Sequence, residues 1–178
     1  MKEYTYKGIT HQMLLETFWY DYVNGGLIWR ERKGLKGKAK TFNKRFANTR
    51  AGNKLSTGYV EINHHGVDFL EHKLVFFYFY GYVPEVIDHA DAKKDNNRIE
   101  NLREATAEQN MWNATGNKNK KSGLPKGVFH HGNNGRFKAQ IMANRKLYTK
   151  GGFVTVEDAV DWLNKMREKL HGSFGRAA

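Results

Sequence analysis

The segment from residue 86 to residue 113 constrains the fold more than any other part of the chain. A short apolar stretch ends in the polar pair Asp88-His89, and a polar excursion then leads into a second short apolar stretch. Thr106 and Gln109 have the spacing of a capping box, which marks the start of a helix. The pattern therefore predicts a strand, a turn, a second strand and a helix in immediate succession.

The polar residues of this segment suit the hydrolysis of a phosphodiester, which needs a cation and a base to activate water. Asp88 offers a charged oxygen and Asn110 an amide oxygen, which are hard ligands suited to magnesium, with manganese as the alternative. His89 points to the other side of the strand and is placed to act as a general base if an acceptor holds its second ring nitrogen. Asn101 can offer that acceptor.

The order of these residues, IDHxDxxxxNNRxxNLRxATxxQNxxN, resembles the HNH nuclease family, in particular its phage and intron-encoded homing endonucleases. The resemblance implies His89 as general base, Asn101 as its orienter, and Asp88 and Asn110 as metal ligands. Asn110 stands where the family name has histidine, as in a known subgroup. The resemblance also implies products with a 5′-phosphate and a 3′-hydroxyl. Arg103 keeps two open roles, a phosphate contact or an ion pair with a neighbouring glutamate.

Charge is distributed unevenly around this segment, although the chain as a whole carries +12. Residues 1–56 hold twelve basic and four acidic residues, residues 57–116 hold five and ten, and residues 117–178 hold thirteen and four. Two positive flanks suit a polyanion that is gripped on both sides of a site, and an acidic centre suits a bound cation. We therefore expect double-stranded DNA as the partner. An RNA partner is the alternative that the basic, aromatic composition allows.

The first basic flank is concentrated between residues 30 and 54, which hold ten basic residues and one acidic residue. A solvated loop is one interpretation, and the second basic flank favours phosphate contact. A helix capped by Thr10 is predicted before it, and a hairpin over residues 58–70 followed by a helix over residues 71–80 is predicted after it. The residues expected to contact DNA here are Arg30, Lys33, Lys36, Lys44, Arg45 and Arg50.

The second basic flank begins with a linker, residues 114–125, in which Lys120 and Lys121 are expected to follow the DNA backbone. Three strand patterns and a helix that starts at Thr155 come next. Apolar residues of the helix form one stripe that should pack on one face of the sheet. The other face would carry basic and amide side chains and can enter a major groove.

Two motifs of this region, KGVxxxxxxGRFKAQI and GGFxTxEDAxxW, resemble the plant ethylene-response-factor (APETALA2-type) DNA-binding domain. Phe129 and His131 stand where the plant pattern has arginines, so the DNA sequence that plant members prefer is not transferred. The predicted contacts of the sheet with DNA are Phe129, His131, Arg136, Lys138, Gln140, Arg145, Tyr148 and Lys150.

We therefore expect an α+β protein in three parts: an N-terminal β-hairpin and helix region, a central ββα-metal (HNH) module, and a C-terminal three-stranded antiparallel sheet packed on one helix. The expected boundaries are a basic N-terminal DNA-contacting region over residues 1–56, the HNH module over 57–113, a basic linker over 114–125 and an APETALA2-like domain over 126–178.

The expected function is that of a metal-dependent DNA endonuclease, a site-specific phage homing enzyme that nicks or cleaves duplex DNA. A monomer with one active site most simply nicks. The alternative is a DNA-binding regulator with a non-catalytic HNH scaffold. The absence of cysteine excludes a thiolate zinc site and fits a reducing cytosol, and the longest apolar run, residues 74–80, is too short for a bilayer. We therefore expect a cytoplasmic protein, in the host cell if a phage encodes it.

Overall fold

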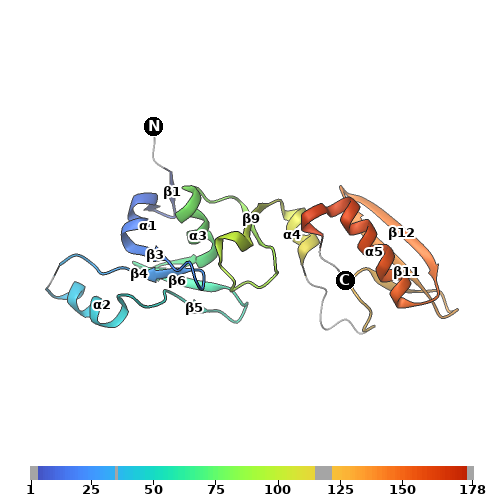
Figure 1. The fold of residues 1–178 in the computed structure, drawn as a ribbon, viewed down its shortest axis with the longest axis horizontal. Coiled ribbons are helices and arrows are strands. Elements are labelled where there is room, and N and C mark those ends of the chain that lie inside the picture. The colour runs from blue at the N-terminus through green and yellow to red at the C-terminus, as the bar shows by residue number, and fades with distance from the viewer. Residues whose placement is uncertain (1–3, 35, 115–121, 176–178) are drawn as a thin grey trace. The chain divides into compact units, whose positions relative to one another are not determined.

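The structure, a computed structural model, describes residues 4–34, 36–114 and 122–175. The chain forms two compact units, Met1–Ala105 and Thr106–Ala178, here called unit 1 and unit 2 (Figure 1). Helices and small antiparallel sheets occur in both, which agrees with the predicted α+β class. None of the described helices is long and apolar enough to cross a membrane.

Unit 1 consists of short strands, four antiparallel sheets and three α-helices within its described residues. The sheets pair β1 with β2, β3 with β4, β5 and β7 with β6, and β8 with β9. The elements in chain order are β1 (Thr5–Tyr6), β2 (Ile9–Thr10), α1 (His11–Thr17), β3 (Phe18–Tyr20), β4 (Leu27–Trp29), α2 (Lys38–Phe46), β5 (Asn53–Lys54), β6 (Val60–His64), β7 (Val67–Leu70), α3 (Glu71–Tyr80), β8 (Val86–His89), the 3₁₀ turn η1 (Ile99–Asn101) and β9 (Leu102–Ala105).

One hydrophobic core holds unit 1 together. Leu14 of α1 and Leu27 of β4 are fully buried in the same cluster as Leu74 and Phe77 of α3, and α1 lies beside α3 in Figure 1. Side chains from both sides of residue 56, the predicted end of the N-terminal region, fill this one core. The basic N-terminal region is part of the unit that carries Asp88 and His89.

The ends of the helices in unit 1 follow local sequence signals. Thr10 caps α1, since its hydroxyl oxygen accepts a hydrogen bond from the Met13 backbone N–H at 3.1 Å. The helix α3 has the predicted bounds and ends at Gly81, whose φ of +72° is the left-handed conformation that favours glycine. Within residues 30–54, for which a solvated loop is one of two interpretations, the chain forms α2.

Unit 2 places one helix on one face of a three-stranded antiparallel sheet. The strand order is β10 (Val128–His131), β11 (Arg136–Ala143) and β12 (Lys146–Phe153), and α5 (Val156–His171) lies across the sheet (Figure 1). This arrangement agrees with the predicted sheet and helix. The predicted apolar stripe of α5 packs here, with Leu163 fully buried against the sheet.

The short helix α4 (Ala107–Asn113) also belongs to unit 2. The Lys126 ammonium group donates to the backbone carbonyls of Met111 at 3.0 Å and Ala114 at 2.6 Å, which stabilises the C-terminal end of α4. The Trp112 ring stacks on the His171 ring with 4.1 Å between centroids. These contacts hold α4 within unit 2, whereas the predicted HNH module includes it and ends at residue 113. Lys120 and Lys121 of the predicted linker lie outside the described residues.

Replacement of Leu163 by alanine is expected to destabilise unit 2 by about 3 kcal/mol, because it removes buried methyl groups and leaves a cavity. Leu147→Ala is the matched control, since the same change is made at a leucine that is 51% exposed. Chemical denaturation followed by circular dichroism measures both. Equal destabilisation by the two variants would contradict the assignment of Leu163 to the core.

Candidate active site

The hairpin of β8 and β9 carries the polar pair at the end of its first strand. In the antiparallel register, Asp88 lies opposite Arg103 and His89 lies opposite Leu102. Ile87 and Leu102 lie in the core of unit 1 and fix the two strands there. Asp88 and His89 are only 3% and 5% exposed, so both polar side chains depend on partners inside the protein.

Arg103 forms an ion pair with Asp88 across the hairpin. Its Nη2 and Nε atoms lie 2.7 Å and 2.8 Å from the same carboxylate oxygen, Oδ2. The Arg103 side chain is 24% exposed, whereas the Asp88 side chain is almost fully buried. Of the open roles of Arg103, the structure shows an ion pair, and the acidic partner is Asp88 rather than a neighbouring glutamate.

The imidazole of His89 contacts the side-chain amide of Asn97, with 3.0 Å between Nε2 and Oδ1. Asn97 is 1% exposed and lies in the polar loop between β8 and η1. The ring of His72 approaches the His89 ring edge-on with 5.1 Å between centroids, and the Tyr59 ring lies 6.1 Å away. The imidazole is therefore surrounded by side chains from several elements of unit 1.

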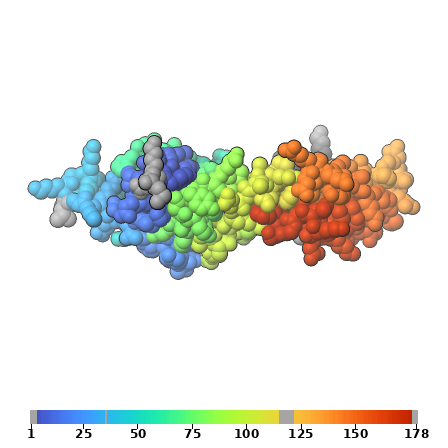
Figure 2. Space-filling view, turned by 90° about the horizontal axis from the view of Figure 1, so that it is seen from above, coloured from blue at the N-terminus to red at the C-terminus, as the bar shows by residue number. Residues whose placement is uncertain are grey.

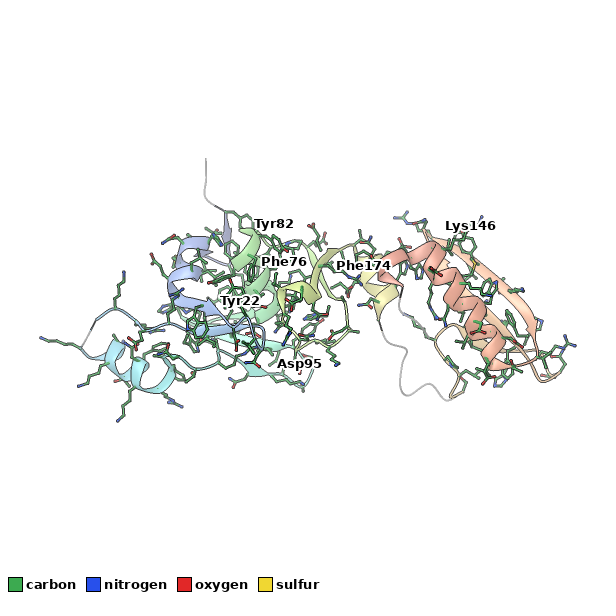
Figure 3. All side chains as sticks on the ribbon, viewed as in Figure 1. Tyr22, Phe76, Tyr82, Asp95, Lys146 and Phe174 are labelled. Atoms are coloured by element: carbon green, nitrogen blue, oxygen red, sulfur yellow. The ribbon has the colours of Figure 1, made fainter. Side chains whose placement is uncertain are left out.

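Asn101, the predicted orienter of His89, makes other contacts. Its Oδ1 accepts from the Asp91 backbone N–H at 3.0 Å, and its Nδ2 donates to Asp91 Oδ1 at 3.0 Å and to the Asn96 carbonyl at 2.8 Å. Asn101 thus ties together the loop that follows β8. An ion pair between Lys54 and Asp95, with 2.6 Å between the charged atoms, holds the same loop to β5. Asp95 is labelled in Figure 3. The amide that contacts His89 is that of Asn97 instead.

Glu71, the first residue of α3, is fully buried behind this loop. Its carboxylate accepts hydrogen bonds from Asn97 Nδ2 at 2.6 Å, from Arg50 Nη2 at 2.7 Å and from the Leu27 backbone N–H at 2.8 Å. Burial raises the pKa of Glu71, and the charge of Arg50 and the two other donors oppose that rise. The Arg50 guanidinium, predicted to contact DNA, is thus engaged with Glu71 and with the Gly25 carbonyl.

His72 lies on α3 beside His89 and is 4% exposed. Burial, together with the neighbouring His89 and Lys73, lowers the pKa of His72 to about 3, so its ring is neutral near pH 7. Among the described residues, no hydrogen-bond partner is found for its Nδ1 atom. A neutral, buried ring packed against His89 has the properties of a structural histidine.

Asn110, the second predicted metal ligand, lies on α4 in unit 2. The predicted capping box that starts this helix is present, because Thr106 Oγ1 accepts from the Gln109 N–H and Gln109 Oε1 accepts from the Thr106 N–H. Asp88, His89 and Asn101 all lie in unit 1.

The donor chemistry of Asp88 and Asn110 fits a hard divalent cation. A buried carboxylate and an amide oxygen are ligands that magnesium and manganese accept, and two protein ligands leave room for water and substrate. Within the residues that the structure describes, no group of three or more histidine, aspartate and glutamate side chains could hold a metal ion. A site made of one carboxylate and one amide does not require such a group.

The predicted DNA contacts of unit 1 lie around an open groove and on α2. Arg30 and Lys33 line this groove together with Trp19 and Phe42. Basic residues with aromatic neighbours are typical of nucleic-acid contact surfaces. Side chains of the light-blue segment around α2 project from unit 1 in Figure 2. The exposed candidates on and near α2 are Lys36, Lys44 and Arg45.

The sheet of unit 2 has one face covered by α5 and one open face. Phe129 pairs with Lys138 across β10 and β11, and Gln140 lies two residues along the same face. Tyr148 pairs with Ile141 and is half-buried in the core, so it lies on the helix-covered face. The open face therefore holds fewer of the residues predicted to contact DNA than the sequence pattern indicates. His131, Arg136, Arg145 and Lys150 are exposed, and Lys150 pairs with the core residue Ala139.

Comparisons with known proteins identify the segment that carries this site. The sequence profile of the HNH endonuclease domain matches residues 69–112, from β7 into α4. Protein 3.8 of Escherichia phage T7 is 32% identical over 90 residues, which are 51% of this chain and 73% of that protein. The chain belongs to the HNH family. Asp88, His89, Asn101 and Asn110 all lie within the matched HNH segment.

A second viral relative carries the family name. An uncharacterized HNH endonuclease of Acanthamoeba polyphaga mimivirus is 36% identical over 88 residues, which are 49% of this chain and 44% of that protein. This chain therefore spans less than half the length of that relative. No solved structure matches the chain. The HNH assignment thus rests on sequence, and the geometry of the hairpin supplies the arrangement of the site.

Proposed function

We propose that this protein is a metal-dependent endonuclease that hydrolyses phosphodiester bonds of duplex DNA. The observation that carries the proposal is the pair Asp88-His89, buried at the end of β8 with each side chain held by a partner, within the segment that the HNH profile matches. Two adjacent, buried and oriented polar groups are costly for folding and suit a reactive site.

In this proposal His89 accepts the proton of the attacking water. Asp88 and Asn110 would hold the cation, magnesium with manganese as the alternative. When bound, such a cation offsets the negative charge that develops on the phosphate oxygens. Asn101 fixes the loop between β8 and η1 through its contacts with Asp91 and Asn96.

DNA binding in this proposal involves both units. The basic residues of the groove and of α2 in unit 1 contact phosphates, and the open face of the sheet in unit 2 reads the target as an APETALA2-like domain. Because one of the viral relatives comes from a phage, we propose a phage enzyme, and we propose further that it is a homing enzyme that acts on a specific site. We propose a monomer in the host cytoplasm that nicks one strand, because one active site cuts one strand at a time.

Incubation with supercoiled plasmid that carries phage DNA tests the proposal. With magnesium, conversion to open circle indicates nicking and conversion to linear DNA indicates double-strand cleavage. A chelator should stop both reactions. Unchanged supercoiled DNA with every divalent metal and every target would contradict the proposed activity.

A DNA-binding regulator with a non-catalytic HNH scaffold is the second candidate. The ion pair between Arg103 and Asp88 favours it, because it neutralises the carboxylate that a cation would need. The two candidates differ in the response of Arg103→Ala. A nuclease in which Arg103 competes with the cation should bind magnesium at lower concentration after this change, whereas a scaffold should lose stability without gaining metal affinity.

The double variant Arg136→Ala, Lys138→Ala is expected to weaken DNA binding and to reduce the slope of log affinity against log salt by about 2, since two phosphate contacts are lost. Both residues lie on β11. The double variant Lys165→Ala, Lys169→Ala, at two exposed positions of α5, is the control that removes the same amount of charge. Fluorescence anisotropy across a salt series measures the slope. An unchanged slope would exclude this strand as a phosphate contact.

A further inference from the structure

We propose that Glu71 and Asn97 are positioning residues that fix the tautomer and the orientation of the His89 imidazole. The inference deepens the proposed function, since it rests on His89 as the general base. Three side chains form one continuous series of contacts from the first residue of α3, through the loop after β8, to the imidazole. The direction of each hydrogen bond in this series follows from the one before it.

The series begins at the Glu71 carboxylate, which is an acceptor on both oxygens. Oε1 accepts the Leu27 backbone N–H at 2.8 Å, and Oε2 accepts Arg50 Nη2 at 2.7 Å and Asn97 Nδ2 at 2.6 Å. The group is fully buried, and three donors surround it, one of them a guanidinium. These contacts stabilise the ionised carboxylate, which has no proton to donate.

The carboxylate fixes the orientation of the Asn97 amide. If the amide were reversed, its carbonyl oxygen would face the Glu71 oxygen at hydrogen-bond distance, and the two acceptors would repel each other. The NH₂ group of Asn97 therefore faces Glu71, and Oδ1 faces His89 Nε2 at 3.0 Å. Because Asn97 is 1% exposed, water does not offer the reversed amide an alternative partner.

The amide in turn fixes the proton of the imidazole. Asn97 Oδ1 can only accept, so His89 Nε2 must carry the proton and donate it. In a neutral imidazole with the proton on Nε2, the lone pair lies on Nδ1. The contact with Asn97 and the edge of the His72 ring also restrict rotation of the imidazole. The basic nitrogen of the proposed general base is therefore Nδ1, in a fixed direction.

This series explains why an arginine far from the hairpin in sequence is turned inward. Arg50 and the Leu27 backbone come from the N-terminal part of unit 1 and hold Glu71 in its ionised form. The residues that precede the HNH segment thus contribute to the state of its histidine. Arg50 thus has a role through Glu71 in this arrangement.

The tautomer is tested in the unmodified protein by ¹⁵N-edited NMR of the histidine side chains, with His89→Gln used to assign the signal. We expect a proton on Nε2 that exchanges slowly with water. A proton on Nδ1 of the neutral ring would overturn the inference. Because no cleavage is measured, this result is independent of the proposed activity. If the wild-type protein shows a protected Nε2–H and the His89→Gln variant still cleaves DNA at the full rate, the inference stands and the general-base role is overturned.

Variants of Asn97 test the consequence for the reaction. Asn97→Leu cannot accept a hydrogen bond, and we expect loss of the protected Nε2–H signal and a kcat lower by about 10- to 100-fold, since misplaced reacting groups cost rates of that order. The Kd for DNA, measured with a chelator present, should not change. In the double variant Glu71→Gln, Asn97→Asp, the glutamine amide can donate to the aspartate, which keeps an acceptor toward His89, so the signal and part of kcat should recover. Wild-type kcat in Asn97→Leu would overturn the inference.

Asn96→Leu is the matched control at the neighbouring position. The Asn96 amide donates to Asp91 Oδ2 at 2.7 Å and makes its contact within the loop. This variant should keep the protected Nε2–H signal of His89 even where loop packing is weakened. Loss of the Nε2–H signal in both Asn96→Leu and Asn97→Leu would mean that the loop as a whole protects this proton. That result would overturn the specific role of Asn97.

Discussion

His89→Ala is expected to reduce DNA cleavage by about a thousandfold while leaving DNA affinity unchanged. The imidazole is the group in unit 1 that is buried, oriented by an amide and adjacent to the proposed ligand Asp88. Its removal takes away the proposed acceptor of the water proton, and the basic surfaces that bind phosphates are unaffected. Plasmid cleavage rates and anisotropy with a chelator measure the two quantities separately.

His130→Ala is the control for this prediction, because it removes an exposed histidine of β10 that pairs with Phe137, a residue packed against the core of unit 2. It should leave both cleavage and binding at the wild-type level. Cleavage by His89→Ala at an undiminished rate would remove the general base from the proposed mechanism. A parallel loss of affinity would instead indicate that His89 contributes to DNA binding or to the fold.

The local structure around the site could be predicted from the sequence because short-range signals determine it. The strand that ends in Asp88-His89, the helix from Glu71 to Tyr80 and the capping box of Thr106 all occur where the pattern predicts them. Each depends on neighbouring residues alone: an apolar run, a terminal glycine or a side chain that caps the first turn. The HNH motif consists of such signals.

The helix α2 is harder to predict from the sequence, because few apolar residues mark its buried face and most of its residues are polar or charged. Ala39, Phe42 and Phe46 have helical spacing, but six of its nine residues are lysine, arginine, threonine or asparagine. In the structure, the Phe42 ring meets the Trp29 ring at 5.4 Å and lies 3.6 Å from the Arg32 guanidinium. Contacts with residues outside the helix stabilise it. The density of charge in this segment, taken without those contacts, is typical of a solvated loop.

The partners of the site residues could not be predicted either, because they depend on tertiary structure. Asn97 and Asn101 lie in the same polar loop, and the sequence does not show which amide reaches His89. Glu71 gave little signal, because an acidic residue in the first turn of a helix ordinarily complements the helix dipole at the surface. Its burial, and with it the need for donors such as Arg50, is a property of the tertiary structure.

Acidification from pH 6.5 to pH 4 is expected to destabilise unit 1 by roughly 3 kcal/mol through His64 alone. Burial, together with the charges of His65 and Arg32, lowers the pKa of His64 to about 4. The ring packs 6.0 Å from the rings of Phe18 and Trp29. An unfolded chain has the ordinary pKa near 6.5, so it binds a proton first as the pH falls, and the folded state is disfavoured throughout this window.

His64→Gln should make the dependence of unfolding free energy on pH less steep, because it removes one of the buried groups that take up a proton on unfolding. His65→Gln makes the same change at the exposed neighbour and should leave the slope steep. Urea denaturation at a series of pH values measures both. His72, whose pKa is lowered to about 3, adds to the acid sensitivity in both variants. A slope that His64→Gln leaves unchanged would mean that His64 stays accessible to protons in the folded state.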